Sequence, residues 1–181
     1  NCTSSISIAM QGRQIVVIKT PDKLMVLVMI TVTDARGKKL HFSTPPQRVI
    51  SLVPSTTETL FELGCESNLV GVTRFCVHPI EKCKQQIKIG GTKNIDIERI
   101  ILQKPELAFC NIEENTKDIC EELERHHIQT YVAFPKTVDN ALLDIENMGK
   151  IMGKEQNAEN HVSHITKQIK SITKQSFHYC Y

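Results

Sequence analysis

Apolar residues in the middle of the chain form a short continuous run followed by a helically spaced set. The run 49–53 is almost wholly apolar, which is typical of a parallel strand covered on both faces. Ser55 and Glu58 match the S-x-x-E capping box, so a helix is predicted to begin at Ser55 and to end at Gly64. The side chains predicted to face the sheet are Leu60, Phe61 and Leu63. A second strand up to Val72 completes a βαβ unit.

Strand and helix patterns continue to alternate as far as residue 134. The predicted elements are a short helix over 80–86, a helix capped by Asn94 or Asp96, a strand over 107–110, a helix capped by Asn115 or Thr116, and a strand over 128–134. This alternation predicts an α/β fold with a largely parallel sheet. Ligands of such sheets bind at the carboxyl ends of the strands, so the loops that follow the strands are the first places to search for a site.

The beginning of the chain has a different pattern. Residues 30–42 alternate on both sides of the turn-rich tetrad 34–37, which predicts a β-hairpin. The apolar run 24–32 is far shorter than the roughly 20 residues of a membrane span, and no small-x-small cleavage site follows it. Residues 1–28 are therefore expected to be an N-terminal extension of unknown role.

From Val138 onward the pattern is purely helical, in two runs separated by Gly153. The second run spaces its apolar residues four and three apart, so that they form one narrow stripe; these are Ala158, Val162, Ile165, Ile169 and Ile172. An uncovered stripe of this kind favours dimerisation or aggregation.

Charge and cysteine content exclude several classes of protein. The 22 basic and 20 acidic residues give a net charge of +2, and no basic stripe interleaved with aromatics is present, so nucleic-acid binding is not expected. The seven cysteines form no C-x-x-C pair, which argues against a structural zinc site. Their odd number, in a chain long enough for a full core, indicates reduced thiols rather than a disulfide framework.

Motifs of catalysis are absent from the sequence. There is no G-x-S-x-G elbow and no H-E-x-x-H pair, and the glycines of 90–92 have neither the P-loop nor the dinucleotide spacing. His161 and His164 share a helical face at a spacing that could chelate a metal, but their place beside the apolar stripe favours a solvent-facing role. We therefore expect a non-catalytic protein with no intrinsic cofactor or metal site.

Several separate segments, in order, resemble one known family. They are RVISLVPSTTETLFELGCESNLVGVT (48–73), TRFCVHP (73–79), IGGTKNIDIERI (89–100), KPELAF (104–109) and EENTKD (113–118). Together they resemble the helical-backbone (class III) periplasmic substrate-binding proteins of ABC importers, and in particular the vitamin B12 and iron-siderophore binders. Because the segments match in order over about residues 29–175, the resemblance is more specific than one short motif.

The resemblance implies a division of the chain. Residues 29–152 would be an α/β ligand-binding lobe, 153–175 the linking backbone helix, and 176–181 an irregular tail. In the resembled family the ligand lies in the cleft between two such lobes, and the second lobe is expected to be absent from this chain.

The resemblance also implies which residues face a ligand. They are Pro54, Ser55 and Thr56 at the start of the first helix, Arg74, Phe75 and His78 after the second strand, Gly91 and Thr92 at the glycine turn, and Glu114 on the rim. Phe75 could stack on a macrocycle, and His78 could bind the metal or donate a hydrogen bond. The simpler role for residues 54–56 is to cap the helix that they begin, and the simpler role for Gly91 and Thr92 is to form a tight turn. Glu98 corresponds to an acidic residue that docks on an arginine of the permease.

The function implied is that of the substrate-binding component of an ABC importer, which binds a metal chelate such as cobalamin or a ferric siderophore, with haem as a further candidate. Its partners would be the chelate and the permease subunits. The alternatives are a cytosolic ligand-sensing or enzyme-associated domain that reuses the lobe, and a direct metal-ion binder. The resemblance implies an extracytoplasmic location, whereas the unpaired cysteines and the missing signal peptide favour the cytoplasm.

Overall fold

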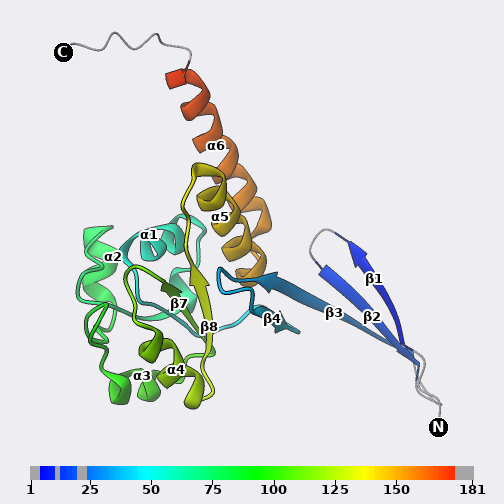
Figure 1. Cartoon of the computed structure of the whole chain (residues 1–181), viewed down its shortest axis with the longest axis horizontal. Helices are drawn as coiled ribbons and strands as arrows, with labels where there is room; N and C mark the ends of the chain where they lie inside the picture. The colour runs from blue at the N-terminus through cyan, green and yellow to red at the C-terminus, as the bar shows by residue number, and fades with distance from the viewer. Residues whose placement is uncertain (1–4, 11–12, 20–23, 174–181) are drawn as a thin grey trace.

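A computed structural model describes residues 5–10, 13–19 and 24–173 (Figure 1). The strands are β1 (Ser5–Met10), β2 (Arg13–Lys19), β3 (Leu24–Thr33), β4 (Lys39–Phe42), β5 (Val49–Ser51), β6 (Leu69–Val72), β7 (Leu107–Asn111) and β8 (Gln129–Ala133). The helices are α1 (Pro54–Glu62), the 3-10 turn η1 (Glu66–Asn68), α2 (Ile80–Gln85), α3 (Ile97–Gln103), α4 (Lys117–Arg125), α5 (Val138–Met152) and α6 (Glu155–Thr173). The predicted tail 176–181 lies outside the described residues.

Four parallel strands form the central sheet of the lobe. Their order is β6-β5-β7-β8, with β5 paired in parallel to both β6 and β7, and β7 to β8. A parallel pair needs a crossover connection, and here α1, α3 and α4 supply the helices between successive strands. The predicted α/β fold with a parallel sheet is confirmed.

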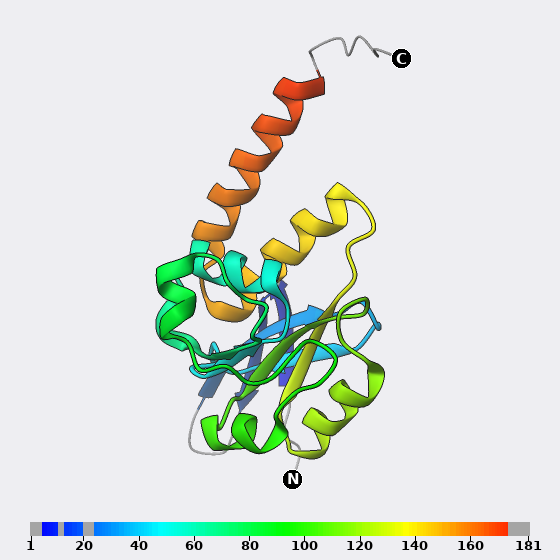
Figure 2. The same cartoon turned by 90° about the vertical axis from the view of Figure 1, so that its left-hand side faces the viewer.

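Each face of this sheet is covered by its own core. On one face, α1, α5 and α6 pack with the β3–β4 hairpin on side chains such as Val49, Phe109 and Tyr131. On the other face, α3 and α4 pack on Ile50, Leu52 and their neighbours. Residues 49–53 are all 0–3% exposed, as expected for a strand buried on both faces. The resulting three layers are seen in Figures 1 and 2.

Both edge strands of the parallel sheet, β6 and β8, form hydrogen bonds with segments that lie outside this sheet. On β8, the Ala35 N–H donates to the Val132 carbonyl at 2.9 Å, and the Arg36 guanidinium donates to the Thr130 carbonyl at 3.0 Å. On β6, the Val72 N–H donates to Ile87 and its carbonyl accepts from Ile89. An open edge is a template for pairing with another chain, and both edges here are blunted by short segments.

A network of charges holds the hairpin turn on β8. The Arg36 guanidinium bonds to Asp34 at 2.8 Å, to the Thr130 hydroxyl at 2.8 Å and to Glu124 at 3.1 Å. Glu124 also accepts from the Lys38 ammonium at 2.8 Å and from the Thr130 hydroxyl. Burial opposes ionisation of Glu124, but the hydrogen bonds from Lys38, Thr130 and Arg36 outweigh it and lower the pKa of its carboxyl.

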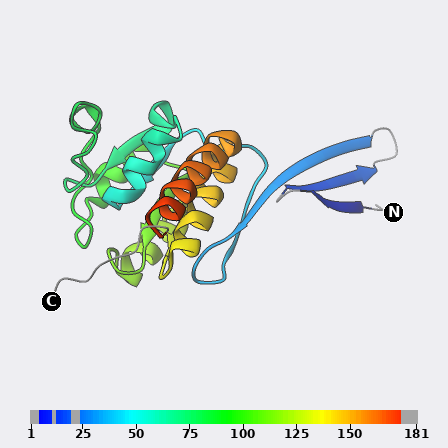
Figure 3. The ribbon, with the colours of Figure 1, turned by 90° about the horizontal axis from the view of Figure 1, so that it is seen from above.

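The predicted hairpin over 30–42 is confirmed as β3 and β4, and its register pairs Ile30 with Phe42. Its first strand begins earlier than expected, at Leu24, and pairs with β2 as far as that residue. Strands β1, β2 and β3 form an antiparallel ribbon that extends away from the lobe (Figures 1 and 3). The segment 1–28, predicted as an extension of unknown role, therefore contains two strands and the start of a third.

The last two helices form a close pair at the edge of the lobe (Figure 3). A Cβ on Gly149 of α5 would lie 2.4 Å from the Ala158 Cβ of α6, so the glycine permits the two backbones to approach. Along the predicted apolar stripe of α6, Ala158 is buried, the middle positions are half-buried, and Ile172 is 51% exposed. Helix α6 therefore leaves the lobe with its stripe progressively uncovered (Figure 2). No helix among the described residues combines the length and the apolar character that crossing a membrane requires.

Replacing Glu124 by Gln should lower the free energy of unfolding at pH 7 by about 1 kcal/mol, because it removes the charge that Arg36 and Lys38 neutralise. A carboxyl with a lowered folded pKa stabilises the fold above its unfolded pKa of about 4.3, and this stabilisation is lost as the pH falls through the folded value. The difference between wild type and Glu124→Gln in urea unfolding should therefore shrink below about pH 4.

The matched control is Glu121→Gln, because Glu121 lies on the same helix and pairs only with the exposed Lys117 among the ion pairs of the described residues. A cost at pH 7 as large as that of Glu124→Gln would show that the hairpin network adds nothing to stability.

Candidate ligand-binding site

The carboxyl ends of β5, β6 and β7 bring three loops and a glycine turn together at one edge of the sheet. They surround a depression of about 410 Å³, lined by Pro54, Phe75, Thr92, Lys93 and Glu114. These residues are far apart in sequence, and the parallel order of the strands places them side by side. Such a crevice is where open α/β sheets bind their ligands.

Helix α1 begins one residue before the predicted start. Its N-cap is Val53, which makes no side-chain cap, and Pro54 occupies the first turn. The prediction that Ser55 and Glu58 form a capping box is therefore wrong. Proline is well suited to the first helical position because its fixed φ fits a helix and its missing N–H would have no helical acceptor. Ser55 is then inside the first turn and cannot act as the N-cap.

A buried polar cluster takes over the task of fixing this loop. The Thr57 hydroxyl lies 2.8 Å from the Ser51 hydroxyl, 3.0 Å from the Val53 carbonyl and 3.1 Å from the Cys76 thiol. The Cys76 sulfur also lies 3.2 Å from the Thr73 hydroxyl. All four side chains are 0–1% exposed. The cluster joins the end of β5, the start of α1 and the loop after β6, so it sets the relative position of two walls of the depression.

The loop after β6 presents an aromatic ring and a cation. The Arg74 guanidinium carbon lies 5.1 Å from the centre of the Phe75 ring, within the range of a cation–π contact. Both side chains pack over Gly91, where an added Cβ would lie 3.3 Å from Phe75 and 3.4 Å from Arg74. Phe75 remains 48% exposed. The ring therefore offers a flat apolar face to a ligand.

Asn115 fastens the third loop to the other two. Its amide donates to the Thr92 carbonyl at 2.8 Å and to the Leu52 carbonyl at 3.4 Å, and its oxygen accepts from the Asn111 N–H at 2.9 Å. The side chain is 5% exposed, so these bonds are shielded from water. One amide thus holds the end of β5, the glycine turn and the loop that carries Glu114.

The depression combines opposite charges with an apolar surface. Lys93 in the lining, and Arg74 next to the depression, can pair with carboxylates of a ligand. Glu114 can accept hydrogen bonds from amides or hydroxyls. Phe75 and Pro54 add apolar contact area. The depression thus offers both charged groups and apolar area, and the five residues of its lining contain no pairing of a nucleophile with a base.

Four of the nine predicted ligand-facing residues line the depression, namely Pro54, Phe75, Thr92 and Glu114. Arg74 and Gly91 adjoin the depression, because the Arg74 and Phe75 side chains contact each other and pack over Gly91. Ser55 and Thr56 follow Pro54 in the first turn of α1 but are outside the lining. His78 lies at the far end of its loop, where its carbonyl accepts from the Cys83 thiol. Glu98 is exposed in the first turn of α3.

Sequence reasoning missed Lys93 and the buried polar cluster. Lys93 follows the paired glycines directly, so its place in the turn was the available signal. The cluster has no local signal, because its members come from β5, α1 and the loop after β6. Within the described part of the chain, no three His, Cys, Asp or Glu side chains are grouped so as to hold a metal ion, and His161 and His164 belong to no such group.

Comparison with known proteins gives consistent results. The family model of the periplasmic binding proteins matches residues 49–176. The vitamin B12-binding protein of Photorhabdus laumondii is 27% identical over 130 residues, 72% of this chain and 47% of its own length. An uncharacterized ABC transporter substrate-binding lipoprotein of Bacillus subtilis, YvrC, is 27% identical over 79% of this chain and 46% of its own length. The chain therefore spans about half the length of these relatives.

Solved structures agree on the fold. The siderophore-binding protein BauB, in complex with acinetobactin and ferric iron, has a TM-score of 0.67 at 24% identity, over 80% of this chain and 53% of that one. A periplasmic haem-binding protein of Pseudomonas aeruginosa has a TM-score of 0.66 at 22% identity, over 71% and 46%.

Gly90→Ala should destabilise the protein strongly, because Gly90 has φ +102° and an added Cβ would lie 2.6 Å from the Asn94 carbonyl oxygen. Gly37→Ala is the matched control, since Gly37 has φ +78° but open space around it. We expect a loss of roughly 1 kcal/mol for Gly37→Ala and more than about 3 kcal/mol for Gly90→Ala in chemical unfolding. Equal losses would mean that the glycine turn tolerates a side chain.

Proposed function

The chain belongs to the periplasmic binding protein family, and from this membership we propose that it is the first lobe of a substrate-binding protein that carries a metal chelate to an ABC importer. The observation that carries the proposal is the convergence of Pro54, Phe75, Thr92 and Glu114 on one depression at the carboxyl edge of the sheet. The role is binding without catalysis, which agrees with the family. In the proposed division, 29–152 is the lobe and 153–175 the linking helix.

The proposed ligand is cobalamin or a ferric siderophore, with haem as a further candidate. These chelates share a broad, partly apolar body with polar groups at its rim. The exposed Phe75 ring matches the body, and Lys93 and Glu114 match the rim. A relative named as a vitamin B12-binding protein and solved siderophore- and haem-binding neighbours support this class.

Ser55, Thr56, Arg74 and Gly91 would serve the same ligand from beside the depression. The first turn of α1 has backbone N–H groups with no acceptor inside the helix, and these point toward the carboxyl edge of the sheet. His78 would contact only a ligand that extends along its loop. Among the described residues, no three His, Cys, Asp or Glu side chains are grouped so as to hold a bare metal ion, so the proposed ligand is a metal that arrives already chelated.

Phe75→Ala should weaken chelate binding on the order of tenfold, because it removes the ring that the ligand stacks on. The matched control is Val77→Ala, since Val77 is 55% exposed in the same loop and lies outside the lining. The measurement is an absorbance titration of the chain with cyanocobalamin, haemin and a ferric hydroxamate siderophore, followed by amide chemical shifts.

Binding of one chelate that is weakened on the order of tenfold in Phe75→Ala and unchanged in Val77→Ala would support the proposal. Equal affinity in both variants, shifts confined to the face that α3 and α4 cover, or no saturable binding of any of the three would contradict it.

Glu98 is proposed as the contact to an arginine of the permease. Glu98→Lys should weaken binding of the chain to its importer in lipid nanodiscs several-fold and leave chelate affinity unchanged, with a smaller effect at high salt because exposed charges are screened. Glu121→Lys, at an acid on α4 that is also exposed, is the control. If the two variants bind the importer alike, Glu98 has no docking role.

A further inference from the structure

The depression at the carboxyl edge of the sheet carries charges that the described part of the protein leaves unpaired. Lys93 and Glu114 belong to its lining, and the Arg74 guanidinium lies against the Phe75 ring beside it. The ion pairs among the described residues include none of these three charged side chains, so Lys93 and Glu114 do not pair even with each other. Two cations and one carboxylate are therefore available to a ligand.

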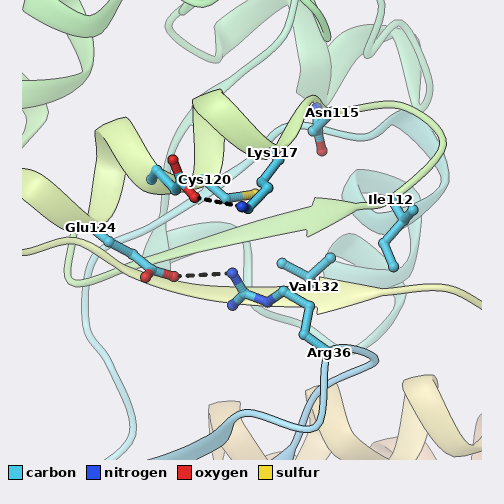
Figure 4. Close-up of a pocket in the computed structure, with 8 residues that line it drawn as sticks. Arg36, Ile112, Asn115, Lys117, Cys120, Glu124 and Val132 are labelled. Carbon is cyan, nitrogen blue, oxygen red and sulfur yellow. Dashed lines mark hydrogen bonds and ion pairs between the residues drawn. The ribbon is translucent and has the colours of Figure 1, made fainter.

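A larger cavity of the same lobe has the opposite arrangement. It has a volume of about 490 Å³ and opens between α4 and the edge strand β8 (Figure 4). Both cations of its lining are paired within the lining, Arg36 with Glu124 at 3.1 Å and Lys117 with Glu121 at 3.2 Å. The charges of that cavity thus balance each other, whereas the charges at the depression require a counter-charge from outside.

The backbone fixes both cations of the depression before any ligand binds. The Arg74 N–H donates to the Gly90 carbonyl at 2.8 Å, which ties the loop after β6 to the glycine turn. The Thr92 carbonyl of that turn accepts from the Asn115 amide at 2.8 Å, and Lys93 is the next residue along the chain. Because the backbones that carry the two cations are already held, less conformational freedom is lost when they bind a ligand.

We infer that the site selects a metal chelate that carries free carboxylates on its rim. The inference rests on the proposed function and narrows the class of its ligand. Positive charge is in excess here, and guanidinium and ammonium groups form strong, charge-assisted hydrogen bonds to carboxylates. The amides around the corrin ring of cobalamin would leave both cations without a counter-charge. Haem, through its two propionates, and a ferric polycarboxylate share the required chemistry.

The test compares haemin with its dimethyl ester in absorbance titrations of the chain. The two compounds have the same ring and iron and differ only in their free carboxylates. We expect haemin to bind on the order of tenfold more tightly than the ester, and the difference to shrink at high salt. Ferric citrate, which has carboxylates but no ring, tells the two sources apart. Salt-sensitive binding of haemin or of ferric citrate is the expected result, and the one that binds shows whether the ligand has a flat ring.

Substitutions of opposite sign test the same charges. Lys93→Gln should weaken haemin binding several-fold, and Glu114→Gln should strengthen it by a similar factor because a repelling carboxylate is lost; neither should change affinity for the ester. The matched control is Lys84→Gln on α2, since Lys84 pairs with Glu81 and lies outside the lining. All three substituted side chains are exposed, so folding should be unaffected, which circular dichroism checks.

The outcomes separate this inference from the proposed function. Equal affinity for haemin and its ester, a preference for cyanocobalamin, or a Lys93→Gln variant that binds haemin as Lys84→Gln does would overturn the inference and leave the binding of a metal chelate standing. Saturable binding of none of these chelates would overturn both.

Discussion

Parallel strand pairing is the constraint from which the rest of this structure follows. Because β5, β6, β7 and β8 all run in one direction, every strand ends at the same edge, and each connection must return through a helix on one face or the other. The return helices bury both faces, which explains the nearly continuous apolar run 49–53. The loops that precede them meet at one edge, where a ligand can contact several segments at once.

Polar groups buried beneath this edge give the loops a defined position. The hydroxyls of Thr57 and Thr73 contact the Cys76 sulfur, and the Thr57 hydroxyl also bonds to that of Ser51. Asn115 bonds to carbonyls of two other segments. Such groups are costly to bury unless they find partners, so their arrangement has few alternatives. Cysteine serves in two ways here: Cys76 is part of a polar cluster, and Cys65 is a small buried apolar side chain.

Much of the fold could be predicted from the sequence because its signals are local. Asp96 and Thr116 cap α3 and α4 as their positions indicate, and Gly64 follows α1 with a positive φ. The exception is the start of α1, where two local signals compete and Pro54 prevails over Ser55. The outer strands β1 and β2 escaped prediction because they pair with one another and with β3, and a pairing partner is not visible in a run taken alone.

The sequence by itself determined most elements of the lobe, their buried faces and the loops that follow the strands of the parallel sheet, since periodicity, caps and turns act within a few residues. The resemblance to a known family, carried by the same sequence, implied Pro54, Phe75, Thr92 and Glu114 as residues that face a ligand. Only the tertiary structure decided that Lys93 joins them, that His78 lies apart and that Arg36 closes the edge of β8. These facts depend on contacts between segments distant in the chain, which arise from packing and have no local pattern.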